Sequence, residues 1–239
     1  MSGTPEHVVR SYGQELRRLR DMIIEMGGIV ENQIAMAAEA IMSRDSETAV
    51  RAVEGDPGVD ALEREIEQFA IRLLALRQPV GEDLRLIVAA FKISSDLERI
   101  GDYAVNAAKR SIVLDQFTLP FSLAGLAQMA RLVQQNVKRV IDAIGENDAE
   151  AAMEAWRSDQ AIDDIYTTIF RELITYMMED ARNITSCTHL LFIAKNLERI
   201  GDHATNIAER LYYAVKGEPL LEARPKSDTS PYAVVRPKE

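Results

Sequence analysis

Acidic residues recur in this chain at a spacing of four, which places two side chains on one face of a helix. The pairs are Asp56/Asp60, Glu98/Asp102, Asp159/Asp163 and Glu198/Asp202. Carboxylates that converge repel each other, so a protein protonates them, pairs them with bases or places a cation between them. We therefore predict that these eight residues bind metal ions.

The predicted ligand set consists of oxygen atoms alone. No His lies at helical ligand spacing, and the single cysteine, Cys187, has no partner in the sequence. Oxygen donors suit hard cations such as Mg²⁺ or Ca²⁺, or Mn and Fe, better than structural zinc. Glu63, Asn106 and Asn206 are candidate outer ligands because they lie near the acidic pairs along their helices.

The positions of the pairs predict which of them meet. If the chain folds back at Pro79, residues equally far from that turn lie side by side, and the pairs centred on 58 and 100 have their midpoint at 79. The later pairs centre on 161 and 200, with a midpoint beside a polar turn at 180–183. In each half of the chain, four carboxylates should lie at one height on two antiparallel helices.

Each acid also has an ordinary explanation. Asp56 and Asp159 lie near expected helix starts, where an acid can cap the helix and complement its dipole. Glu98 and Glu198 each precede an arginine and could be solvated charges. The same register in two halves of the chain favours cation binding.

Helical periodicity extends over nearly the whole chain and predicts an all-α protein. Helices are expected at about 8–43, 46–55, 56–77, 82–113, 122–144, 147–156 and 158–179, followed by a last long helix that ends near 216. Ser46 is the expected N-cap of the second helix. In the helix over 82–113, Leu84, Val88 and Phe91 form a second apolar stripe, which predicts burial from two sides.

An internal repeat divides the chain. The segment Leu-Glu-Arg-Ile-Gly-Asp at 97–102 recurs at 197–202, and the first acidic pair recurs 103 residues later. Such identity at matching places predicts a tandem duplication. We predict domains at 1–116 and 117–216, and a disordered proline-rich tail at 217–239.

Composition narrows the class of function. The formal net charge is −10, which argues against a nucleic-acid-binding surface. A lone cysteine fits a reducing cytosol, and no signal region or membrane-spanning segment is evident, so a cytoplasmic location is expected.

Three small features have alternative explanations. Gly27-Gly28 marks a close-packing or bending point, and Gly101 and Gly201 indicate either close approach to the acidic pairs or simple helix crossing. His203 is expected to be a surface or interface histidine rather than a ligand.

The doubled Leu-Glu-Arg-Ile-Gly-Asp-x-Ala-x-Asn motif resembles the PhoU family of phosphate-uptake regulators. Met26-Gly-Gly, Arg77-Gln78-Pro79 and Asp83-Leu84-Arg85 support the resemblance, which covers about residues 7–216. It implies two three-helix bundles with about six long helices, often dimeric, and a multinuclear metal cluster of Fe, Mn or Mg on the acidic motifs of each bundle. The second copy lacks Gln-Pro and has Asn196 where the first has Asp96.

By the same resemblance, the protein is a non-enzymatic negative regulator of phosphate uptake and of the phosphate-starvation response. Its implied partners are the ATP-binding subunit of a phosphate ABC transporter and a membrane sensor histidine kinase, so peripheral membrane contact through them is expected.

Two other functions compete with this one. A carboxylate-bridged di-metal oxidase would also use a helical bundle, but that class carries Glu-x-x-His pairs, which this sequence lacks. A structural helical spacer would fit the repeat, but it has no reason to keep four facing acids in each copy.

Overall fold

The computed structural model describes residues 5–119, 122–222 and 224. The described residues form six long α-helices, one short α-helix and a single 3-10 turn, η1 (Ala181–Asn183). The α-helices are α1 (Pro5–Ser43), α2 (Ser46–Glu54), α3 (Asp56–Arg77), α4 (Gly81–Leu114), α5 (Ala124–Glu146), α6 (Ala149–Glu179) and α7 (Ile184–Lys216). No strand occurs within these residues, and the predicted all-α, duplicated architecture is confirmed.

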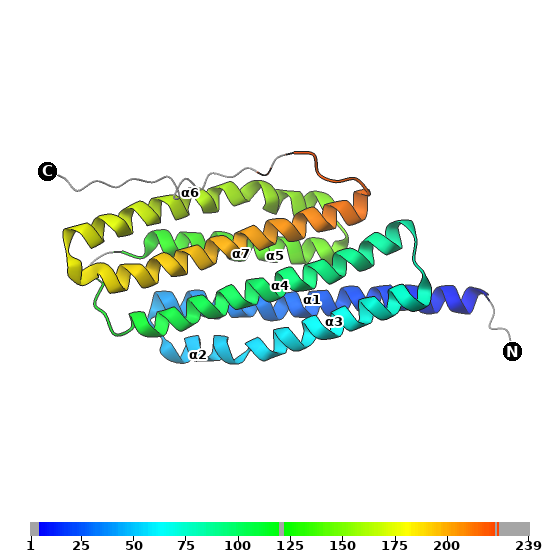
Figure 1. Cartoon of the computed structure of the whole chain (residues 1–239), viewed down its shortest axis with the longest axis horizontal. Helices are drawn as coiled ribbons and strands as arrows, with labels where there is room; N and C mark the ends of the chain where they lie inside the picture. Colours follow the sequence, from blue (N-terminus) through cyan, green and yellow to red (C-terminus); the bar gives the residue numbers. More distant parts are fainter. Residues whose placement is uncertain (1–4, 120–121, 223, 225–239) are drawn as a thin grey trace.

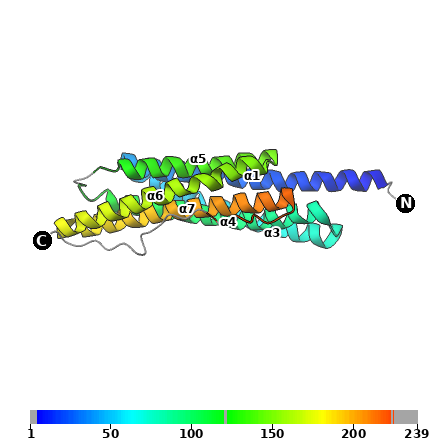
Figure 2. The ribbon, with the colours of Figure 1, turned by 90° about the horizontal axis from the view of Figure 1, so that it is seen from above.

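The long helices lie along the long axis of the molecule, with α4 and α7 side by side at its centre (Figures 1 and 2). Helices α1, α2 and α3 flank α4, whereas α5 and α6 flank α7. A single apolar core continues through both repeats and includes the equivalent residues Ile100 and Ile200, both fully buried. Within the described ranges, no helix combines the length and the apolar character that a membrane crossing needs.

The start of α2 differs from the expectation. Asp45, not Ser46, caps this helix, because its carboxylate accepts the backbone N–H groups of Glu47 and Thr48 at 2.9 and 3.3 Å. The Ser46 hydroxyl instead donates to Asp115 at 3.0 Å.

The predicted break near residue 157 was wrong, since α6 is continuous from Ala149 to Glu179. In the first repeat, Gly55 separates α2 from α3 and Pro57 follows at the helix start. The equivalent positions hold Ser158 and Gln160, which a helix interior tolerates, so the second repeat has one helix where the first has two.

The expectation of two buried faces on α4 was also wrong. Ile93, Leu97 and Ile100 are buried as expected. By contrast, Leu84, Val88 and Phe91 keep 38–40% exposure. The α4 helix packs against α1, α2, α3 and α7, and its remaining side borders an opening of about 550 Å³ that Val88 helps to line.

A buried ion-pair network joins the two repeats. Two residues of α7 approach the carboxylate of Asp96 on α4. Nδ1 of His203 lies 2.9 Å from Oδ1 of Asp96, and Nε of Arg210 lies 2.5 Å from its Oδ2. His203 is therefore an interface histidine, as expected. Asn196 stands at the equivalent position of the second repeat, so this network occurs on one side of the α4–α7 contact and makes it asymmetric.

The predicted division into 1–116, 117–216 and 217–239 stays a prediction. The predicted disorder of the tail concerns residues that lie mostly outside the described part of the chain. Of the tail, only residues 217–222 and Arg224 are described.

The glycine pair of α1 is a close-packing point. A Cβ on Gly27 would lie only 2.8 Å from Cδ1 of Ile141 on α5, whereas a Cβ on Gly28 would meet no atom within 4 Å. Gly27 thus permits close contact between α1 and α5, and Gly28 does not contribute to it.

This contrast gives a stability test with a built-in control. Gly27→Ala should lower the free energy of unfolding by about 1–3 kcal/mol, because Ile141 must move out of a packed interface. Gly28→Ala should raise it by up to about 1 kcal/mol, since alanine favours an exposed helix position. Urea unfolding of both variants measures the difference, and a Gly27→Ala protein as stable as the parent would contradict the packing argument.

Candidate metal centres

The two helix hairpins bring the acidic pairs together at the predicted heights. A Cβ on Gly101 of α4 would lie 3.5 Å from Cγ1 of Val59 on α3. In the second repeat, a Cβ on Gly201 of α7 would lie 2.8 Å from Oδ1 of Asp159 on α6. The register predicted from the turns is confirmed, and both glycines leave room for side chains of the facing helices.

The first acidic cluster, formed by Asp56, Asp60, Glu98 and Asp102, is open to solvent on one side. The side chains of Asp60 and Asp102 are 46% and 40% exposed. Arg99 lies 3.5 Å from Glu98 and 3.6 Å from Asp102, at the edge of hydrogen-bonding range. These weak ion pairs leave the cluster with excess negative charge.

The pKa values of two carboxyl groups in the first cluster are raised, in part by this excess negative charge. Burial raises the pKa of Asp56, and the charges of Asp102 and Asp60 raise it further. Burial also raises the pKa of Glu98, again with a contribution from Asp102. Burial and mutual repulsion thus disfavour the ionised form of these carboxyl groups. A cation placed among them would stabilise that form.

Gln33 of α1 is a polar side chain at this cluster that the sequence interpretation missed. It is 1% exposed, and neither its amide nitrogen nor its oxygen has a hydrogen-bond partner of good geometry. Its oxygen would lie 3.0 Å from a Cβ on Gly101. A side-chain hydrogen bond from Gln33 lowers the pKa of Asp56, so its amide is a polar partner of that carboxyl, although the geometry of this contact is poor. Gln33 is therefore a candidate neighbour for a cation held by Asp56.

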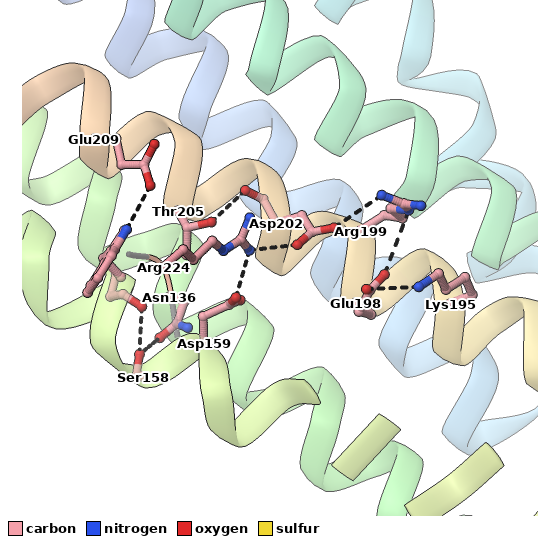
Figure 3. A network of polar contacts seen from close by, with 12 residues as sticks. Asn136, Ser158, Asp159, Lys195, Glu198, Arg199, Asp202, Thr205, Glu209 and Arg224 are labelled. Carbon is pink, nitrogen blue, oxygen red and sulfur yellow. Dashed lines mark hydrogen bonds and ion pairs between the residues drawn. The ribbon is translucent and has the colours of Figure 1, made fainter. Parts of the chain in front are cut away.

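The second acidic cluster, formed by Asp159, Asp163, Glu198 and Asp202, is far more buried. These four residues are 1–9% exposed. Lys195 donates to Glu198 at 2.8 Å, and Arg199 donates to Asp202 at 3.3 Å (Figure 3). Arg199 corresponds to Arg99 of the first cluster, but Lys195 is a basic partner that the first cluster lacks, since its equivalent is Ser95.

An arginine from beyond α7 completes the second cluster. Nη2 of Arg224 lies 2.6 Å from Oδ2 of Asp159 and 2.6 Å from Oδ1 of Asp202 (Figure 3). Burial nevertheless raises the pKa of Asp159 to about 6, although Arg224 acts in the opposite direction. No helical periodicity or motif singles out Arg224, so the sequence interpretation missed it.

The capping explanation fails for Asp56 and Asp159, and the solvated-charge explanation fails for Glu198. Gly55 precedes α3 and no side chain caps this helix, so Asp56 is not a cap, although it lies in the first turn, where it complements the helix dipole. Asp159 lies inside the continuous α6. Glu198 is 5% exposed and is not a solvated charge.

The three candidate outer ligands lie farther from the centres of the two acidic clusters. Burial raises the pKa of Glu63, and neighbouring Glu67 and Asp60 add to this shift, so Glu63 extends the first cluster. Asn106 is exposed, and Asn206 lines the opening beside α4.

The donor set fits a hard cation in its chemistry, because it combines eight carboxylates with the buried amide of Gln33. Across the described ranges, no three His, Cys, Asp or Glu side chains are already placed around a common point that could hold a metal ion. The eight acids therefore remain predicted ligands.

Comparison with known proteins links this architecture to one family. The PhoU domain model matches residues 23–111 and 126–211. The phosphate-specific transport system accessory protein PhoU homolog of Caulobacter vibrioides is 50% identical over 224 residues, covering 93% of this chain and 97% of that one. The accessory protein PhoU of Serratia marcescens is 39% identical over 89% of this chain and 88% of that one.

Solved structures agree with the sequence matches. The crystal structure of PhoU from Pseudomonas aeruginosa superimposes with a TM-score of 0.84 at 39% identity, over 87% of this chain and 100% of that one. The phosphate transport system regulatory protein PhoU of Streptococcus pneumoniae gives a TM-score of 0.81 at 31% identity, over 87% and 99% of the two chains.

Gln33 and its equivalent Asn136 offer a paired test. Replacing Gln33 by Met removes a buried amide that has no hydrogen bond of good geometry and should raise the free energy of unfolding of metal-free protein by about 1 kcal/mol. Asn136 accepts a hydrogen bond from Ser158 at 2.7 Å, so Asn136→Leu should lower it by about 1–3 kcal/mol. Urea unfolding in the presence of a chelator measures both, and a destabilised Gln33→Met variant would show that its amide is already satisfied.

Proposed function

Since the chain belongs to the PhoU family, we propose that it is a regulatory accessory protein of a phosphate transport system. In this role it restrains phosphate uptake and the phosphate-starvation response when phosphate is plentiful. The observation that carries the proposal is the 50% identity to an accessory protein of that name over nearly the full length of both chains.

The proposal extends to partners. The protein acts between the ATP-binding subunit of a phosphate ABC transporter and the sensor histidine kinase of the phosphate two-component system. It does so as a cytoplasmic homodimer that reaches the membrane through these proteins. The accessory-protein names of the relatives support a regulatory rather than an enzymatic role.

Each bundle is further proposed to hold a multinuclear cluster of Fe, Mn or Mg on its four carboxylates. At the first cluster, the excess negative charge and the buried amide of Gln33 beside Asp56 support this proposal. A bound cation would neutralise the carboxylates, while α3 and α4 fix the four ligands at one height. Asp60 and Asp102 provide the exposed side through which an ion can enter.

Removal of one ligand from each cluster tests the metal proposal. Asp102→Asn and Asp202→Asn should each reduce tightly held metal, and the double variant should lose nearly all of it, because an amide is a weaker donor to a hard cation. Elemental analysis of gently purified protein measures Fe, Mn and Mg. Asp115→Asn, which removes one side of an exposed ion pair with Arg44, serves as the control. Parent protein that neither retains nor takes up any of these metals would refute the metal sites.

Deletion of the gene tests the regulatory role. In phosphate-rich medium, the deletion strain should show raised phosphatase expression and raised phosphate uptake, because the restraint on the kinase and transporter is lost. Reporter activity and labelled phosphate uptake measure these outcomes, and a plasmid copy of the gene should reverse both. Unchanged expression and uptake in the deletion strain would rule out the proposed function.

A further inference from the structure

Arg224 occupies the position in the second acidic cluster where a cation would bind. One guanidinium nitrogen bridges carboxylates from two helices, α6 and α7, at 2.6 Å each (Figure 3). The Arg224 side chain is 15% exposed, and those of Asp159 and Asp202 are 2% and 12% exposed. A carboxylate buried this deeply needs a counter-charge, and the chain itself supplies one.

The path of the chain after α7 accounts for this contact. Gly217 ends α7 with a left-handed backbone (φ 79°), which reverses the chain direction. From Asp202 to Lys216 the helix rises about 21 Å, and the seven residue-to-residue steps from Gly217 to Arg224 span up to about 23 Å when extended. Residues 217–224 therefore have the length needed to return from the end of α7 to the acidic cluster.

The returning segment is held at intermediate points. Leu220 packs against the apolar core, and Pro219 lines the opening beside α4 together with Tyr213. The Arg85 guanidinium donates to the carbonyl of Ala214 at 3.2 Å, and a Cβ on Gly217 would lie 3.2 Å from its Cζ. These contacts direct Arg224 toward the second cluster.

We propose that Arg224 is an internal competitor for metal at the second acidic cluster, so that a metal ion enters only when Arg224 and residues 217–222 leave. This inference rests on the proposed metal sites. Metal–carboxylate distances of about 2.0–2.6 Å would place an ion beside the guanidinium, where the two positive charges repel. The carboxylate oxygens can then hold one cation or the other.

The proposal has two consequences. The second cluster binds metal more weakly than its carboxylates alone would allow, whereas the first cluster has no such competitor among the described residues. By linkage, metal bound at the second cluster weakens the attachment of residues 217–224 by the same factor. Metal occupancy thereby determines whether the segment after α7 is attached or released.

The single tryptophan provides a local probe of the second cluster. Trp156 lies one helical turn before Asp159, is 2% exposed and donates to Glu209 at 2.8 Å. A terbium ion bound to the second cluster would accept energy from this indole and emit. Excitation at the red edge of tryptophan absorption avoids the tyrosines, so the emission reports on the second cluster rather than the first.

The experiment titrates Tb³⁺ into full-length parent, Arg224→Gln and Lys216→Gln proteins. Lys216→Gln is the control because it removes a positive charge near the same end of the chain. In the parent, Lys216 pairs with Glu150, away from the cluster. Arg224→Gln should lower the Tb³⁺ concentration at half-maximal emission by about tenfold or more, because a buried competing charge is removed. The Lys216→Gln midpoint should match the parent, and Asp202→Asn should reduce the emission in all backgrounds.

A second measurement on the parent protein needs no variant. Amide hydrogen exchange in residues 217–222 should become faster at saturating Mn²⁺, as the segment is released. Equal Tb³⁺ midpoints for parent and Arg224→Gln, or exchange that Mn²⁺ leaves unchanged while elemental analysis shows both clusters filled, would overturn the inference alone. Failure of both clusters to bind any ion, in Arg224→Gln as well as in the parent, would instead overturn the metal proposal.

Discussion

Carboxylates placed at the contact between helices need compensating positive charge, and much of this structure follows from that need. The two hairpins, α3–α4 and α6–α7, each bring four acids to one height. The glycines at 101 and 201 allow the helices and the polar side chains to approach closely there. Without compensation, repulsion would oppose the helix packing on which both bundles depend.

The two repeats compensate their acids differently. In the first, the charges are partly hydrated, Arg99 pairs weakly, and the buried amide of Gln33 has no hydrogen bond of good geometry. In the second, Ser95 is replaced by Lys195 and Gln33 by the hydrogen-bonded Asn136, and Arg224 binds two of the acids. A duplicated sequence has thus produced one open and strongly negative cluster and one closed cluster with internal counter-charges.

The sequence predicted what depends on periodicity and on position along the chain. Helix positions, the duplication and the hairpin register all follow from spacings that the structure confirms, including the contact of Val59 with Gly101. It did not predict Gln33 or Arg224, because each reaches its cluster from another element through tertiary packing. The continuity of α6 was missed because the duplication suggested a break that only Gly55 and Pro57 of the first repeat encode.

A regulatory protein needs an element with two states, and the helical core is poorly suited to that role. Its apolar side chains form one continuous packed cluster across both repeats, and Asp96, His203 and Arg210 fix α4 against α7. The segment after α7 differs, because it is held by a few contacts and by an ion pair that another cation could replace. The part of the molecule best able to change with metal occupancy therefore lies outside the repeat, on the surface of a scaffold that need not move.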